Sequence, residues 1–165
     1  MSGKLTATKQ NALTREELEE FLTRDEASGK LLPIMRVATI RPDGFPHVTP
    51  AWYVWENDKF YISYGAERQH VKNLRKNDHI GLIIDEDLRP EKGPEVGAKA
   101  VSVRGTATLS TDPDLCREVT RKELTKFLGP EKMRVFLEPA LAEGRCIITV
   151  EPVRLLTWDF SKATE

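Results

Sequence analysis

The chain reads IMRVATIRPDGFPHVTPAWYVWENDKFYISY from Ile34 to Tyr64. β-Branched and aromatic residues dominate this stretch, as is typical of strands. Pro42-Asp43-Gly44 predicts a turn, because proline presets φ and glycine accepts a positive φ, and Glu56–Lys59 predicts a second hairpin turn. We therefore expect an antiparallel meander of three strands, at residues 34–41, 47–55 and 60–64.

Helical patterns flank this meander. Thr14 and Glu17 stand in capping-box spacing, and an apolar stripe follows at Leu18, Phe21 and Leu22. Further helices are predicted at residues 68–76, 112–128 and 131–141, the last two separated by Gly129-Pro130.

The remaining segments predict more strands. Lys99–Ser110 alternates between apolar and polar residues, so one face of this strand is expected to be buried. His79–Ile84 predicts another strand. Arg145–Val150 predicts one more, which Pro152 interrupts, and residues 155–160 form either its continuation or a final strand. Asp85–Glu95 carries many charges and predicts a solvated loop.

Strands that mostly lack crossover helices predict a small barrel or a curled sheet with helices at its ends. We expect residues 1–12 to form a loose arm and residues 13–165 to form a single domain.

Composition narrows the functional class. The 165 residues include 25 Lys and Arg and 26 Asp and Glu, a net charge of −1 that argues against a nucleic-acid partner. No apolar run is long enough to cross a membrane, and Met1–Gln10 does not resemble a secretory signal. The cysteines Cys116 and Cys146 form neither a disulfide framework nor a metal knuckle, so we expect a reduced, cytoplasmic protein without a membrane partner.

Several common catalytic motifs are absent from the sequence. It contains no dinucleotide fingerprint, no P-loop and no nucleophile elbow. His47, His70 and His79 lack zinc-ligand spacing, so no metal site is expected. No acid, base or nucleophile can be nominated from spacing, and the catalytic residues stay unknown.

Two features suggest a ligand site. Arg68, Lys72, Arg75 and Lys76 lie on one helix face just after a strand that contains Ser63, an arrangement that suits either a phosphate cradle or a solvated surface. An aromatic cluster on neighbouring strands could stack a planar heterocycle, fill the core or form a subunit contact. Its members are Trp52, Tyr53, Trp55, Phe60, Tyr61 and Tyr64.

The order of these elements resembles the pyridoxamine 5'-phosphate oxidase-like split-barrel flavoproteins. The similar segments are Thr39–Trp52, Phe60–Gly65 with Arg68–Arg75, Val103–Ala107, and Val150–Arg154 with Trp158. The resemblance implies a mainly β, antiparallel split barrel with peripheral helices. It also implies a homodimer that binds FMN or the deazaflavin F420 in the grooves between its subunits.

The resemblance also implies which residues contact the cofactor. His47, Val48, Thr49, Pro50, Ala51 and Trp52 would run along the ring, largely through their backbone. Ile62 and Ser63 would approach the ribityl chain and the phosphate, which Arg68 would grip. Gln69, His70, Lys72 and Asn73 would lie close by.

Three departures from the family pattern bear on function. Gln69 stands where the FMN oxidases carry a second basic residue, and His70 stands where deazaflavin-type relatives often carry lysine. The chain also ends without the basic segment that holds the substrate phosphate in pyridoxamine phosphate oxidases. The sequence therefore argues against vitamin B6 oxidation and leaves FMN and F420 both open.

The first functional hypothesis is an oxidoreductase that transfers a hydride between bound FMN or F420 and a small organic substrate. A second is a non-catalytic carrier or sensor of a flavin or haem-like ligand. A third, a small barrel that binds single-stranded nucleic acid, is disfavoured by the near-neutral charge.

Overall fold

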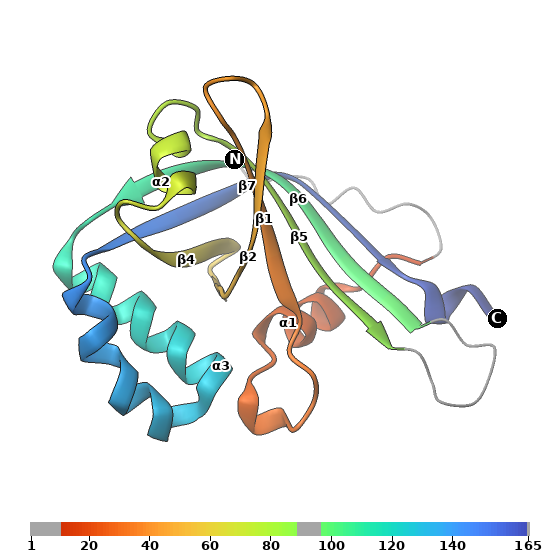
Figure 1. Ribbon diagram of the computed structural model, residues 1–165. Helices are drawn as coiled ribbons and strands as arrows, with labels where there is room; N and C mark the ends of the chain where they lie inside the picture. Colours follow the sequence, from red (N-terminus) through yellow and green to blue (C-terminus); the bar gives the residue numbers. More distant parts are fainter. Residues whose placement is uncertain (1–10, 89–96, 165) are drawn as a thin grey trace.

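The computed structural model describes residues 11–88 and 97–164 and is built around one curled antiparallel sheet (Figure 1). The strands lie in the order β2-β1-β5-β6-β7-β4-β3. Their bounds are β1 Ile34–Ile40, β2 Pro46–Ala51, β3 Val54–Glu56, β4 Lys59–Gly65, β5 His79–Leu88, β6 Gly97–Ser110 and β7 Arg145–Asp159. The helices are α1 Arg15–Thr23, α2 Gln69–Leu74 and α3 Pro113–Ala142, with short 3-10 turns at Glu26–Ser28 and Phe160–Thr164. This architecture confirms the predicted mainly β split barrel with peripheral helices.

The predicted strand at 47–55 is wrong, because the structure divides it in two. β2 pairs with β1 and β3 pairs with β4, and these pairs lie at opposite edges of the sheet. The chain leaves the sheet at Trp52 and Tyr53 to pass from one edge to the other. The expected three-stranded meander is therefore two separate hairpins, and the passage between them curls the sheet into a split barrel.

The predicted loop at Asp85–Glu95 is wrong in its first part. β5 continues to Leu88 and pairs with β6 along its whole length. Glu86 lies inside the barrel, where it forms an ion pair with Arg24, so its charge marks a buried pair rather than solvent exposure. The rest of the predicted loop, residues 89–96, lies outside the described residues.

The predicted interruption of the last strand at Pro152 is wrong, whereas the alternative that the segment from Leu155 continues the same strand is confirmed as far as Asp159. β7 runs without a break, and its register against β6 shifts where Arg104 pairs with Arg154 while Gly105 pairs with Pro152. This bulge absorbs the proline by leaving Val153 unpaired. Gly105 is needed there, because a Cβ would lie 2.7 Å from the Glu151 carbonyl oxygen.

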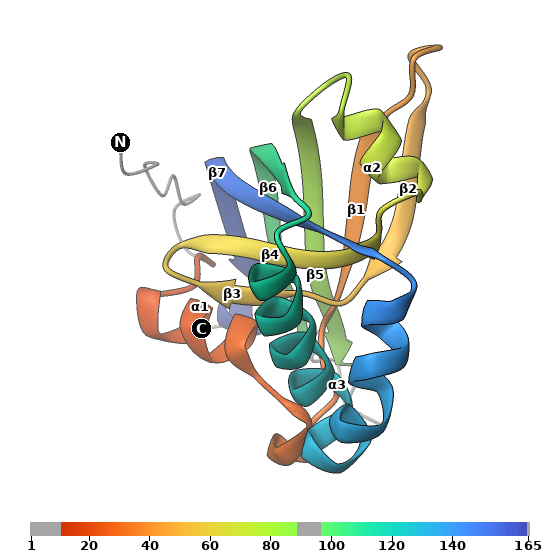
Figure 2. The ribbon, with the colours of Figure 1, turned by 90° about the vertical axis from the view of Figure 1, so that its left-hand side faces the viewer.

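The helices follow the predicted signals. The Thr14 hydroxyl accepts from the Glu17 amide while the Glu17 carboxylate accepts from the Thr14 amide, so the predicted capping box is confirmed. Asp112 caps α3, and Gly129, with φ 82°, breaks α3 into the two predicted arms. Figure 2 shows these arms side by side, the first crossing in front of β4 and the second leading into β7.

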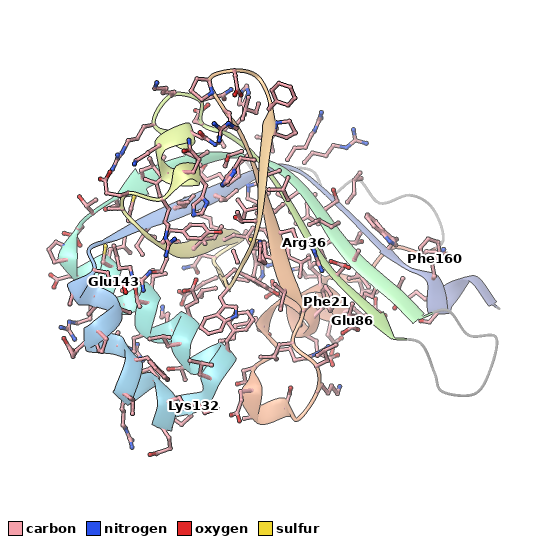
Figure 3. The ribbon with its side chains drawn as sticks, viewed as in Figure 1. Phe21, Arg36, Glu86, Lys132, Glu143 and Phe160 are labelled. Carbon is pink, nitrogen blue, oxygen red and sulfur yellow. The ribbon has the colours of Figure 1, made fainter. Side chains whose placement is uncertain are left out.

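The core fills the concave side of the sheet. Alternate residues of every strand point inward, among them Met35, Val37, Phe60, Ile62 and Ile84, which are buried. Helix α1 closes one end of this core with Leu18, Phe21 and Leu22 (Figure 3). Among the described helices, none is long and apolar enough to cross a membrane.

The described residues nearest the N-terminus are tied to the end of β7. The Asn11 carbonyl accepts from the Asp159 amide at 2.7 Å, and the Ala12 carbonyl accepts from Lys162 Nζ at 3.1 Å. The remainder of the predicted arm, residues 1–10, lies outside the described part of the chain.

Candidate functional site

The β1–β2 turn, the end of β4 and helix α2 meet at one end of the sheet (Figure 1). The sequence-predicted ligand residues belong to β2, to β4, to α2 with its N-cap, or to the bend that follows β2. They are His47, Val48, Thr49, Pro50, Ala51, Trp52, Ile62, Ser63, Arg68, Gln69, His70, Lys72 and Asn73.

Strand β2 has an open backbone edge, since it is the outermost strand on its side of the sheet. In the hairpin, the Arg41 amide donates to the Phe45 carbonyl at 3.0 Å, so ladder hydrogen bonds fall on the odd-numbered residues of β2. Pro46 and Pro50 occupy alternate positions, where no N–H is needed toward β1. The Val48 amide and carbonyl therefore face the open edge, free for hydrogen bonds to a planar ligand.

The side chains of β2 divide between two faces. His47, Thr49 and Ala51 pair with the buried face of β1 and point into the barrel. Val48 and Pro50 point outward, and Val48 is 58% exposed. Only part of the predicted β2 set can therefore face one ligand through its side chains.

An aromatic cluster lies at the inner end of this region. His70 is buried with its ring centroid 3.5 Å from that of Tyr64 and 5.8 Å from that of His47. The hydroxyls of Tyr64 and Thr49 are 3.3 Å apart and share a hydrogen bond. Both nitrogens of His70 are buried and have no hydrogen-bond partner within the described part of the chain.

The unpartnered imidazole of His70 is an unusual feature. Burial is the largest cause that lowers the pKa of His70 to about 4, and the nearby His47 and Arg68 contribute to the same shift. The ring is therefore neutral at pH 7, with one N–H donor and one nitrogen acceptor. Burying both without partners costs free energy, so the site is poised for a polar ligand.

Arg68 supplies an uncompensated cation beside this cluster. It is the exposed N-cap residue of α2 and has no ion-pair partner among residues 11–88 and 97–164. A Cβ on Gly65 would lie 3.5 Å from Arg68 Cγ, so the arginine stem passes closely over the end of β4. By contrast, Lys72 and Arg75 both approach Glu67, at 3.4 and 4.0 Å. Arg68 is thus the better anion ligand of the predicted basic face.

Two other predicted residues on α2 fasten the helix to the sheet. Asn73 is buried and donates through Nδ2 to the Thr39 hydroxyl at 2.9 Å. The side-chain oxygen Oδ1 of Asn73 accepts a hydrogen bond from Nε2 of Gln69 at 2.8 Å. Asn73 and Gln69 therefore hold α2 on β1, and this orients Arg68 and His70.

The two predicted residues on β4 face opposite sides. The side chain of Ile62 is fully buried in the core. The Ser63 hydroxyl shares a 2.7 Å hydrogen bond with the Thr120 hydroxyl on α3, and its amide donates to Glu123 at 3.2 Å. The Ser63 hydroxyl is therefore directed toward α3, where Thr120 occupies one of its hydrogen-bonding positions.

Glu123 and Lys126 are buried charged residues of α3 that no pattern in the sequence singled out. Burial raises the pKa of Glu123 to about 8 and lowers the pKa of Lys126 to about 7. Lys126 Nζ donates to the Leu22 carbonyl at 2.6 Å and lies 3.6 Å above the ring of Tyr53. Both residues lie on the inner face of the predicted helix 112–128. That position is the one signal in the sequence that could have drawn attention to them, and it is weak evidence that a charged residue is buried.

Trp52 occupies the bend between β2 and β3. Its ring stacks on Phe127 of α3 with centroids 5.2 Å apart and planes 5° apart. The predicted aromatic cluster is therefore divided: Tyr53, Trp55 and Phe60 belong to the core, while Trp52 is half-buried at the bend.

The convex face of β1, β5, β6 and β7 holds a separate groove of about 430 Å³. The groove is hollow at Ala38 and Gly81, because alanine has only a methyl side chain and glycine has none. Ile40 and Val153 also line the groove and are exposed. None of the described helices lies over this groove. It is the type of apolar surface that a subunit contact covers.

Comparison with known proteins gives a family match. The family described as pyridoxamine 5'-phosphate oxidase matches residues 14–159, nearly the whole chain. Curated proteins give no significant match.

Solved structures with the same fold include proteins of different recorded roles. A conserved hypothetical protein of Mycobacterium tuberculosis is 19% identical, with a TM-score of 0.79 and coverage of 97% of this chain and 93% of the other. An F420 reductase is 23% identical, with a TM-score of 0.54 and coverage of 83% and 94%. HutZ, a heme storage protein from Vibrio cholerae, is 18% identical, with a TM-score of 0.60 and coverage of 84% and 89%.

Proposed function

Because this chain belongs to the pyridoxamine 5'-phosphate oxidase family, we propose that it is an oxidoreductase that binds FMN or F420. Its substrate would be a small organic molecule. When bound, the cofactor ring supplies the hydride acceptor or donor. The protein supplies binding, orientation and exclusion of water.

The observation that carries this proposal is that Arg68 lies close to His70, two residues away in the chain. Among residues 11–88 and 97–164, Arg68 is an exposed cation without an acidic partner, and the neighbouring His70 is buried with two unpartnered nitrogens. A phosphate suits both, because it accepts several hydrogen bonds and carries negative charge. The residues present therefore fit the phosphate of a flavin-type cofactor.

The open edge of β2 suits the ring of the same cofactor. The Val48 amide and carbonyl face that edge between two prolines that block strand addition. We infer that the backbone of residues 47–51 aligns the ring, while Lys72 adds positive charge farther from the phosphate. Ile62, Ser63, Gln69 and Asn73 would act by supporting β4 and α2.

The functional unit would be a homodimer with a cofactor in each groove between subunits. Support comes from the apolar groove that includes Ile40 and Val153, an exposed surface on a sheet face without a covering helix. The free cysteines Cys116 and Cys146 suit a reducing compartment such as the cytoplasm.

A carrier of a haem-like ligand is the second candidate. His70 favours it, because a neutral imidazole nitrogen without a partner is a suitable iron ligand. The structural neighbour HutZ is described as a heme storage protein.

Absorbance titration of the purified protein separates these functions. FMN, F420 and haemin are each added, and binding is followed by the absorbance change and by equilibrium dialysis. Saturable binding of FMN or F420, followed by reduction with a nicotinamide donor or by turnover of an acceptor, supports the oxidoreductase. Binding of haemin alone supports the carrier, and no binding of any of the three refutes both.

A further inference from the structure

His70 has a local environment that opposes its charge. Three groups face it: His47 from β2, Tyr64 from β4 and Arg68 from the start of its own helix. Two of these three are basic, and among the residues that the structure describes no carboxylate forms an ion pair with His70. The imidazole is held neutral by burial and by its cationic neighbour.

A phosphate group would reverse this balance. A phosphate monoester carries nearly two negative charges at neutral pH. Placed beside Arg68, it would favour the charged imidazole through Coulomb attraction and would accept a hydrogen bond from it. Protonation would also make both nitrogens of His70 donors, so that the ring could donate to a phosphate from either nitrogen.

We propose that His70 takes up one proton when the phosphate of the cofactor binds, so that its imidazolium and the Arg68 guanidinium hold the phosphate together. This inference rests on the proposed function. His70 is then a pH-dependent binding residue, unlike a lysine, which would stay charged without the ligand.

The affinity for FMN should fall as the pH rises. Above about pH 7 the free FMN phosphate is fully ionised, since its second pKa lies near 6. Any proton taken up there must come to the protein. The Kd for FMN is therefore expected to rise with pH from 7 to 9, approaching a tenfold rise per pH unit once the pH exceeds the pKa of His70 in the complex.

Calorimetric titration with FMN at pH 7.5 tests this directly. Repeating it in buffers of different ionisation enthalpy gives the number of protons taken up per FMN. We expect close to one proton for the wild type, close to none for His70→Gln, and close to none for riboflavin, which lacks the phosphate. His47→Gln is the matched control, because it removes the neighbouring imidazole, and it should retain the uptake.

Proton uptake by His70 and binding of the cofactor can fail separately in these experiments. If FMN binds without proton uptake, or if His70→Gln takes up the same number of protons as the wild type, the inference is wrong while flavin binding stands. If FMN and F420 both fail to bind at pH 6 and at pH 7.5, the proposed function is wrong. Should His70→Gln fail to fold, the comparison of FMN with riboflavin on the wild type still decides, because it needs no variant.

Discussion

The rings of Trp52 and Phe127 lie face to face, with centroids 5.2 Å apart and planes inclined by 5°. Trp52 stands where the chain leaves one edge of the sheet for the other, and Phe127 stands near the end of the first arm of α3. Phe127 also meets Tyr53 edge to face at 5.9 Å. This contact between helix and bend therefore holds the two hairpins of the split barrel in place.

Replacing Phe127 should loosen that contact. We expect Phe127→Ala to lower the free energy of unfolding by about 2–4 kcal/mol, since it removes two aromatic contacts and leaves a cavity. Denaturant unfolding measures the loss. Phe136→Ala is the control, because Phe136 is 49% exposed on the second arm of α3, and its effect should stay within about 0.5 kcal/mol. Equal losses in the two variants would contradict the role of Phe127.

Two neighbouring carboxylates on β5 should differ in importance. Glu86 pairs with Arg24 inside the barrel, whereas Asp85 pairs with Arg36 on the outer face, where both side chains are exposed (Figure 3). We expect Arg24→Ala to cost about 3–5 kcal/mol, because it leaves Glu86 buried without a partner. Arg36→Ala should cost less than about 1 kcal/mol. Chemical denaturation of both variants checks the order, which a larger loss for Arg36→Ala would reverse.

Glu123 should make the stability of the protein depend on pH. Its pKa is raised to about 8 in the folded state by burial, so the folded chain keeps this proton above pH 4.5 while the unfolded chain loses it. Stability contributed by this group therefore falls as pH rises from about 4.5 to 8. Glu123→Gln keeps an acceptor for the Ser63 amide and removes the titration.

The stability of Glu123→Gln relative to the wild type should thus increase by up to about 1.4 kcal/mol per pH unit. Urea unfolding at pH 5, 6 and 7 measures this. At pH 5 and 6 Lys126, with a pKa of about 7, is still largely charged in the folded state and adds little, so these two points carry the comparison. Parallel pH profiles for the two proteins would show that Glu123 is ionised in the fold.

Arg68 should contribute to the binding of the cofactor phosphate. We expect Arg68→Ala to weaken FMN or F420 binding by about 1.5–3 kcal/mol, the range for a charge-assisted hydrogen bond. Equilibrium dialysis measures the Kd. Lys76→Ala is the control, since Lys76 is an exposed cation just beyond the same helix. An unchanged Kd in Arg68→Ala would remove Arg68 from the site.

The groove on the convex face should form the subunit contact. We expect Val153→Glu to convert a dimer into monomers and to weaken cofactor binding at least about tenfold, because it places a charge in an apolar contact. Sedimentation velocity reports the change. Val135→Glu is the matched control: Val135 is 66% exposed and Val153 is 63% exposed, but Val135 lies on α3 away from the groove. A dimer that survives Val153→Glu would place the contact elsewhere.

Local features of the fold could be predicted from the sequence, whereas features set by long-range strand pairing could not. Helix α1, the break of α3 at Gly129 and the buried face of β6 follow from short-range signals, namely a capping box, the Gly129-Pro130 pair and strict alternation. The division of the strand at Trp52 did not follow, since residues 47–55 have strand-forming composition throughout. Only pairing with β1 at one edge and with β4 at the other separates β2 from β3.

The candidate site shows the same division. The sequence alone brought Arg68 and His70 together, because they lie two residues apart and resemble a phosphate-binding segment. The tertiary structure alone decided that His70 is neutral, unpartnered and stacked between His47 and Tyr64, and that Ser63 turns toward α3. The physical reason is that chain order sets which side chains are available, whereas burial and the charge of neighbours from distant strands set their protonation and their partners.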